Sequence, residues 1–461
     1  MQYFSNLTSG IVQPDAKSIF ISFLASILLV AVVQAETTAF INVNVIPMTS
    51  EVVHRQKTVM VTDGKITLID DVDTTPIPED IQVIDGTDRY LMPGLSEMHG
   101  HIPGAASESL ERILHLYVAN GITLMRGMLG QPSHLTLQQD LLDGKILGPR
   151  LFTSGPSFNG RSVKSPGQAK RMVREQHEAG YDFLKIHPGL SREEFDAVAK
   201  TAQALGIPFA GHVPEDVGLE RALAAGIATV DHLDGYMQTL LPAHEDPSGG
   251  FEGFFGLLLA DQAEEEKIGA IVLATKRANV WNVPTQSLFV HVVSADSAKN
   301  MSVRPEMRYM PATTVQQWAN SKNRVVTDTG YRLETANRAI EVRQKIIKAL
   351  QDSGAGLLLG SDSPQIFNVP GFAIHRELQY LVDAGLTPYE ALLSGTVNPA
   401  RFFGRADTAG TVEVGNDADL VLLDANPLAD ISAARRVHGV MVRGRWVSRS
   451  ELNAMLEALE H

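Results

Sequence analysis

The chain has 461 residues, a formal net charge of −14 and no cysteine; 44% of its residues are hydrophobic and 20% are charged. This composition is typical of a globular protein, and it excludes disulfides, cysteine nucleophiles and thiolate metal ligands. The acidic balance argues against nucleic acid as a partner, because phosphate backbones attract surfaces rich in lysine and arginine. The length suits one large domain with a smaller second unit.

The N-terminal segment predicts an export signal. An apolar run covers residues 19–33, follows Lys17 and leads into Val33-Gln34-Ala35, which has small residues where signal peptidase needs them. The run is short for a membrane-spanning helix, although an uncleaved membrane anchor is the alternative. We therefore expect residues 1–35 to be a signal peptide and the mature protein to be periplasmic or secreted, with no stable membrane span after cleavage.

Both ends of the mature chain have β character. The segments 40–48 and 57–70 are rich in strand-forming residues, and Asp63-Gly64 is typical of a hairpin turn. The C-terminal residues 405–461 return to the same pattern. We expect residues 36–90 and 405–461 to form one small β-sandwich domain, into which the central residues 91–404 are inserted.

The central residues alternate short apolar runs with amphipathic stretches, at intervals typical of a βα unit. The apolar runs end near eight places, which are His99, Arg126, Ser154, His187, His212, His232, residues 280–284 and residues 356–361. Capping signals such as Ser191 with Glu194, and terminal glycines such as Gly206, mark helices between them. Eight such units predict an α/β fold in which parallel strands close into a TIM-like (β/α)8 barrel.

Two segments are longer than a βα unit requires. Residues 240–279 follow the sixth predicted strand, and residues 287–335 follow the seventh. In a barrel, the loops after strands lie on the catalytic face. These segments are therefore either lids and walls that contact substrate, or additional structural packing.

Potential metal ligands follow several predicted strands. His99 and His101 are two residues apart at the end of the first, so both imidazoles point to the same side and can bind one metal ion. An HxH motif alone is weak evidence. Further candidates stand at the same end of their strands, where barrel enzymes carry out catalysis, and these are Lys185, His212, His232 and Asp362.

Together these motifs resemble the amidohydrolase superfamily, and within it the imidazolonepropionase-like and Xaa-Pro dipeptidase-like group. The resemblance covers about residues 38–447. It rests on PGLSEMHGH around His99, the lysine–histidine–histidine series, GSDSP around Asp362, and the tail NPARFFG with GTVEVGNDADLVLLD. These motifs are specific for the superfamily and its fold, and much less specific for substrate.

The resemblance implies a centre of two divalent metal ions. In that centre His99 and His101 would bind the buried ion, and His212 and His232 the more exposed one. Lys185 would be carboxylated by CO2, because a carbamate can bridge two cations and a neutral amine cannot. Without the carbamate, one metal ion would suffice, and Lys185 would be an ordinary lysine. Zinc is the default metal, while manganese, cobalt or iron would also fit.

The activity implied is metal-dependent hydrolysis of an amide C–N bond in small peptides or N-acyl amino acids. Asp362 would bind the first metal ion and act as base and then acid. A cyclic amide, a lactone or a carbamate is the alternative substrate for the same site. A non-catalytic metal-binding or ligand-binding protein is a third interpretation, and the intact ligand set argues against it. The oligomeric state is left open, a homo-oligomer included.

Some positions depart from the family pattern or give weaker signals. Ser96-Glu97 stands where relatives have an apolar residue and aspartate, and TLMRGMLG replaces a TTVRD-like pattern. These differences concern the pocket and not the metal ligands. Four residues are weaker candidates for substrate binding, with a structural hydrogen bond or a surface salt bridge as the alternative for most of them, and these are His187, Tyr236, Arg304 and Arg308.

Overall fold

Strands from both ends of the chain share one sheet in the computed structural model, which describes residues 37–242 and 252–460. The predicted signal peptide and part of the glycine-rich stretch 248–256 lie outside the described residues. The sheet has eight strands, which are β1 (Thr37–Val45), β2 (His54–Thr62), β3 (Lys65–Asp71), β4 (Gln82–Asp85), β5 (Tyr90–Pro93), β13 (Leu420–Leu423), β14 (Val437–Val442) and β15 (Arg445–Ser448).

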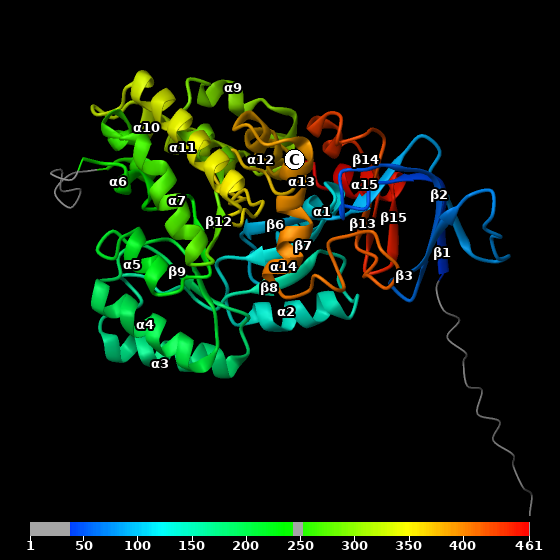
Figure 1. Ribbon diagram of the computed structural model, residues 1–461, viewed down its shortest axis with the longest axis horizontal. Coiled ribbons are helices and arrows are strands. Elements are labelled where there is room, and N and C mark those ends of the chain that lie inside the picture. Colours follow the sequence, from blue (N-terminus) through cyan, green and yellow to red (C-terminus); the bar gives the residue numbers. More distant parts are fainter. Residues whose placement is uncertain (1–36, 243–251, 461) are drawn as a thin grey trace, which may run out of the picture. The chain divides into compact units, whose positions relative to one another are not determined.

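The strand order is β15-β14-β13-β5-β1-β2-β3, and β4 pairs with β1. The two chain ends meet where β13 pairs antiparallel with β5, with Leu420 opposite Pro93. The blue and red strands accordingly lie together in Figure 1. This arrangement is consistent with the β domain expected from both ends, while its boundaries at residues 90 and 405 stay predictions. The predicted hairpin joins β2 to β3, and Asp63 and Gly64 both have positive φ.

The central strands are short and parallel to their neighbours. They are β6 (Leu95–Gly100), β7 (Ile122–Gly127), β8 (Arg150–Thr153), β9 (Leu184–Ile186), β10 (Phe209–Gly211), β11 (Thr229–Asp231) and β12 (Trp281–Val283). They form two sheets, β6-β7-β8 and β12-β11-β10-β9. Each strand ends close to the position that the sequence indicates, so the mixed α/β organisation of the central residues is confirmed.

The structure differs from the predicted barrel at its eighth strand and at its closure. Residues 356–363, which include the predicted eighth strand, form no regular strand and are connected by isolated bridges, Asn282 with Leu357 and Gly100 with Ser363. A further bridge joins the two sheets, between Ser154 and Phe183. The described strands therefore make no continuous closed barrel. The chain leaves the extended conformation at Asp362, where φ is 58°. The apolar run before it predicts a regular strand that the structure does not form.

Helices begin and end where the sequence predicts. α4 (Arg192–Leu205) starts at the capping box of Ser191 and Glu194 and ends at Gly206, whose φ is 73°. Its buried face includes Phe195 and Val198. The other helices that pack around the two parallel sheets include α1 (Leu110–Ala119), α2 (Ser133–Leu142), α3 (Pro166–Ala179), α5 (Leu219–Ala224), α12 (Phe372–Asp383), α13 (Pro388–Gly395) and α14 (Val397–Phe402).

The two long segments are mostly helical. The first contains α6 (Tyr236–Thr239), the 3-10 helices η2 (Phe254–Gln262) and η3 (Glu265–Lys267), and α7 (Ile268–Arg277). The second contains α8 (Gln286–Val293), α9 (Ala298–Ser302), η4 (Pro305–Tyr309), α10 (Ala312–Val326) and the start of α11 (Leu333–Ser353). Buried Lys322 of α10 donates hydrogen bonds to the carbonyls of His291 and Ser294 at the end of α8, which fixes α10 against α8.

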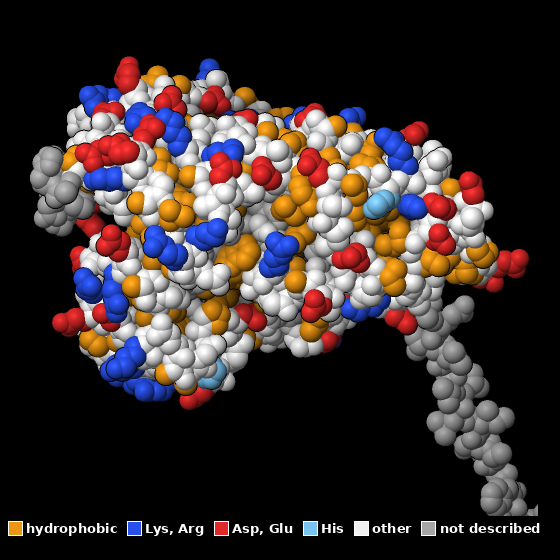
Figure 2. Space-filling view, viewed as in Figure 1, with side chains coloured by type: hydrophobic (Ala, Val, Ile, Leu, Met, Phe, Trp, Pro, Cys, Tyr) orange, Lys and Arg blue, Asp and Glu red, His pale blue; other side chains and the backbone are white. Residues whose placement is uncertain are grey.

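Acidic and basic side chains are interspersed over the face in Figure 2. Within residues 37–242 and 252–460, no helix is both long and apolar enough to cross a bilayer.

Candidate metal centre

Three predicted ligands converge where β6 meets the segment after residue 356. His101 Nε2 lies 2.6 Å from Asp362 Oδ1, and His99 Nε2 lies 3.7 Å from the same oxygen. One ligand atom from each residue lies within 4.8 Å of the others. The backbone holds them there, because the amide of Asp362 donates to the carbonyl of His99 and the amide of His101 donates to Ser363. This set can hold one metal ion.

Lys185 joins this group from β9. Its side chain is fully buried, and Nζ lies 3.5 Å from His99 Nε2. Burial lowers the pKa of Lys185 to about 8. A lysine in this place is not a solvated surface residue, and the lowered pKa increases the fraction of neutral amine, the form that adds to CO2.

His212 and His232 lie beside this group, with ring centroids 4.4 Å apart. His212 Nδ1 lies 2.7 Å from Asp234 Oδ2, and His232 Nδ1 lies 2.9 Å from Thr285 Oγ1. These contacts leave each Nε2 as the free ring nitrogen, in the way that metal-binding histidines are oriented by partners behind them. Burial holds the pKa of His232 well below its usual range, so its ring is neutral and can bind metal.

One buried atom tests whether a second metal ion fits. His232 Nε2 has no hydrogen-bond partner among the residues that the structure describes. A buried polar nitrogen without a partner is costly, and a metal ion would satisfy it. The His99 and His232 rings are 4.5 Å apart, so the two groups of ligands adjoin. His232 and Asp362 also share a positive φ, a strained conformation that is concentrated at functional sites.

Sequence reasoning missed a buried ion pair beneath the histidines. Asp231 Oδ2 lies 2.8 Å from His99 Nδ1, and Arg126 donates to Asp231 across 3.2 Å. Both side chains are fully buried, and Arg126 also donates to the carbonyl of Met98 and to Thr229. The signal was present, because Asp231 and Asp234 flank His232 in TVDHLD. Only the tertiary structure shows that they orient His99 and His212.

Glu97 is a second buried group that the sequence marked only as a departure. Its carboxyl accepts hydrogen bonds from the backbone amides of His99 and Ser361, and from the Ser361 hydroxyl. Burial raises the pKa of Glu97 to about 8. This side chain connects the two segments that carry His99 and Asp362, so it positions ligands and does not itself face a substrate.

The four weaker candidates have different surroundings. His187 is half-buried and its ring lies 5.1 Å from that of His212. The Tyr236 hydroxyl is buried between Thr275 and Asn282. Arg304 contacts His291 and Asp296, and Arg308 contacts Tyr309 and Glu460. Of these four residues, His187 is the one that the structure brings to the histidine cluster.

Comparison with known proteins identifies the family and the fold. The sequence model described as the amidohydrolase family matches residues 90–447. Among solved structures, a bottromycin amidohydrolase has a TM-score of 0.70 and 21% identity, covering 92% of this chain and 90% of that one. A Xaa-Pro dipeptidase with bound methionine has a TM-score of 0.63 and 19% identity, covering 89% and 100%. At these identities the likeness shows the fold alone.

Two characterised relatives are also similar in sequence. Ochratoxinase of Aspergillus niger is 22% identical over 369 residues, which are 74% of this chain and 71% of that protein. An imidazolonepropionase of Thermoplasma volcanium is 38% identical over 82 residues, but the match covers 17% of this chain and 20% of the relative.

Proposed function

The chain belongs to the amidohydrolase family of hydrolases, and from that premise we propose that it hydrolyses an amide C–N bond with two divalent metal ions, zinc by default. Small peptides and N-acyl amino acids are the proposed substrates. The main support for this proposal is that all six predicted ligands lie close together. Among the described residues, His232 Nε2 also has no hydrogen-bond partner. The parallel sheets and the segment 357–363 are, in this proposal, the family's (β/α)8 barrel.

The ligands divide between two ions. His99, His101 and Asp362 would hold the first, and His212 and His232 the second. Lys185 would bridge them as a carbamate, which forms when its neutral Nζ adds to the carbon of CO2 and loses a proton. Bound ions would polarise the scissile carbonyl and lower the pKa of a bound water. The pKa of Lys185, lowered to about 8 by burial, supports the first step.

The chain's own residues would move the proton. Asp362 lies beside both groups, with Oδ1 2.6 Å from His101 Nε2 and Oδ2 3.8 Å from His232 Nδ1. Its carboxylate would accept the proton of the attacking water and return it to the leaving nitrogen. His187, half-buried against His212, is the proposed substrate contact.

The deciding experiment measures metal content per chain and a substrate panel together. Elemental analysis of protein loaded with metal and bicarbonate should give about two ions per chain, and loading without CO2 should give fewer. The panel contains dipeptides, N-acyl amino acids, a lactone, a carbamate and a cyclic amide. Cleavage of the open-chain amides is expected, and no metal binding under any condition would overturn the proposal.

A cyclic amide is the second candidate, favoured by the short stretch that is 38% identical to an imidazolonepropionase. Preferential opening of the cyclic amide in the same panel would select it. We also propose that residues 1–35 direct export, and the N-terminal residue of the secreted or periplasmic protein tests this.

A further inference from the structure

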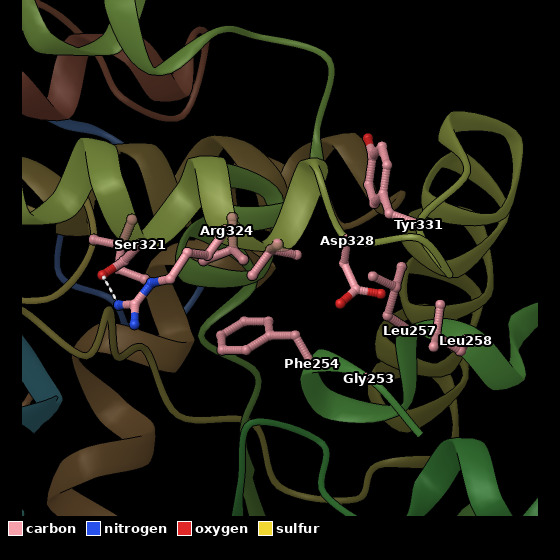
Figure 3. A pocket seen from close by; sticks show the side chains of 11 residues that line it. Gly253, Phe254, Leu257, Leu258, Ser321, Arg324, Asp328 and Tyr331 are labelled. Atoms are coloured by element: carbon pink, nitrogen blue, oxygen red, sulfur yellow. Dashed lines mark hydrogen bonds between the residues drawn. The ribbon is translucent and has the colours of Figure 1, made fainter. Parts of the chain in front are cut away.

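An apolar cavity of about 560 Å³ lies between the two long segments, a volume within the usual range for small-molecule sites. Figure 3 shows Phe254, Leu257 and Leu258 on one side, with Arg324, Asp328 and Tyr331 along the other. Val292, Val325 and Ile366 complete the apolar lining. The walls therefore come from η2, from α8 and α10, and from the segment after Asp362.

The cavity adjoins the metal centre through two consecutive aromatic rings. Phe254 lines the cavity, and its ring centroid lies 4.3 Å from that of Phe255. Phe255 stacks on His232, with centroids 4.8 Å apart and planes 7° apart. Ile366 follows Asp362 on the same segment, and Val292 lies on the helix that begins after Thr285, the partner of His232. A ligand in this cavity would lie next to the predicted metal ligands.

An unusual backbone conformation places the two phenylalanines on different sides of the segment. Phe255 has φ 49° and Gly256 has φ 75°, which puts a non-glycine residue in the left-handed region at some cost. Phe254 thereby faces the cavity while Phe255 covers His232. The two rings therefore link the lining of the cavity to the histidine cluster by direct contact.

The rim of the cavity carries an exposed cation, Arg324. Arg324 is exposed, and its guanidinium donates to Ser321 Oγ across 3.1 Å. Within residues 37–242 and 252–460, no carboxylate lies within ion-pair distance of Arg324. Asp328, also exposed at the rim, disfavours a ligand that carries several negative charges. An apolar interior with an exposed guanidinium at its rim suits an apolar group next to a single carboxylate.

We propose that this cavity binds the large apolar side chain of the substrate's amino-acid portion, and that Arg324 binds its free carboxylate. The preferred substrates are then amides of phenylalanine-like or leucine-like amino acids with an open carboxyl end. This inference rests on the proposed amide hydrolysis and adds substrate class to it. Val325, Phe254 and Arg324 are its specificity-determining residues.

The test compares one filled cavity with one matched control. Val325→Trp introduces a bulky ring into the cavity, whereas Val326→Trp places the same ring at a neighbouring position of α10 that does not line it. Binding of N-acetyl-L-phenylalanine is measured by calorimetry, and KM is measured for this compound and for N-acetylglycine. Val325→Trp should weaken the binding of N-acetyl-L-phenylalanine at least about 10-fold, and the control variant should bind it as the wild type does.

Arg324→Gln tests the charge and is an exposed change that leaves the core intact. It should raise KM for N-acetyl-L-phenylalanine about 10-fold and leave N-acetyl-L-phenylalaninamide unchanged. Arg277→Gln, at another exposed arginine away from the cavity, is the control. Equal effects on both compounds, or unchanged binding in Val325→Trp, would overturn the cavity's role. No binding to the wild type would also overturn it, whereas binding without turnover of any amide would overturn only the proposed reaction.

Discussion

The metal centre and the neighbouring cavity are built in opposite ways. The centre is formed at strand ends by buried groups such as His99, Lys185 and Asp231, each held by polar neighbours. The cavity is formed by helices of the two long segments, with exposed Arg324 and Asp328 at its rim. Rigid strand ends can fix reacting groups precisely, and segments outside the strands can vary without disturbing them. The difference predicts that changes at the cavity alter substrate choice without changing the chemistry at the centre.

The largest effect is expected at Asp362. Asp362→Asn should lower kcat by about 10²–10⁴-fold, because the amide cannot accept the proton of the attacking water. Metal content, measured by elemental analysis, should be retained. Near-normal kcat in this variant would remove Asp362 from the proposed proton transfer, and a loss confined to KM would place it with the cavity residues.

The buried ion pair beneath the centre should control stability more than any cavity residue does. Arg126→Met removes the cation that hydrogen-bonds the buried Asp231 carboxylate and leaves only Lys185, 3.9 Å away, beside it. This costs about 3–5 kcal/mol of unfolding free energy. Urea unfolding of the metal-free protein measures this loss. The exposed Arg161→Met is the matched control. Equal stability of the two variants would show that the ion pair of Arg126 and Asp231 does not stabilise the fold as we describe.

A smaller effect should follow from releasing one histidine. Asp234→Ala removes the partner 2.7 Å from His212 Nδ1 and should lower affinity for the second metal ion about 10–100-fold, without unfolding the protein. Competition with a chelator measures the affinity. The exposed neighbour Asp216→Ala should bind metal as the wild type does. Loss of both ions together would mean that the two groups of ligands do not act separately.

The smallest expected effect is a change in pH dependence. Burial raises the pKa of Glu97 from 4.5 to about 8, so between these values the folded chain keeps a proton that the unfolded chain has lost. The contribution of Glu97 to the free energy of unfolding is therefore fully present at low pH and declines as pH rises toward 8. In metal-free protein, Glu97→Gln should lose less stability than the wild type between pH 5 and 8. Parallel pH profiles from denaturant titrations would contradict this.

The sequence predicted much of the centre because its ligands depend on local position. His99, Lys185, His212 and His232 each stand at or just after the end of an apolar run, and parallel strands bring such ends to one side. The polar atoms of Tyr236, Arg304 and Arg308 contact other protein groups in the structure, such as Asn282 for Tyr236, and their role as substrate contacts stays a prediction. Their proximity to the centre along the chain said nothing about where their polar atoms would point.

By itself, the sequence determined the order of the elements, several helix caps and which residues are candidate ligands, because these follow from periodicity, residue type and motif. The tertiary structure alone decided that Asp231 and Arg126 support His99, that Glu97 connects two segments, and that Phe254 and Phe255 link a cavity to His232. Each of these contacts joins residues far apart in the chain or depends on an unusual φ. A one-dimensional pattern does not encode which distant side chains meet, since that is set by how the elements pack.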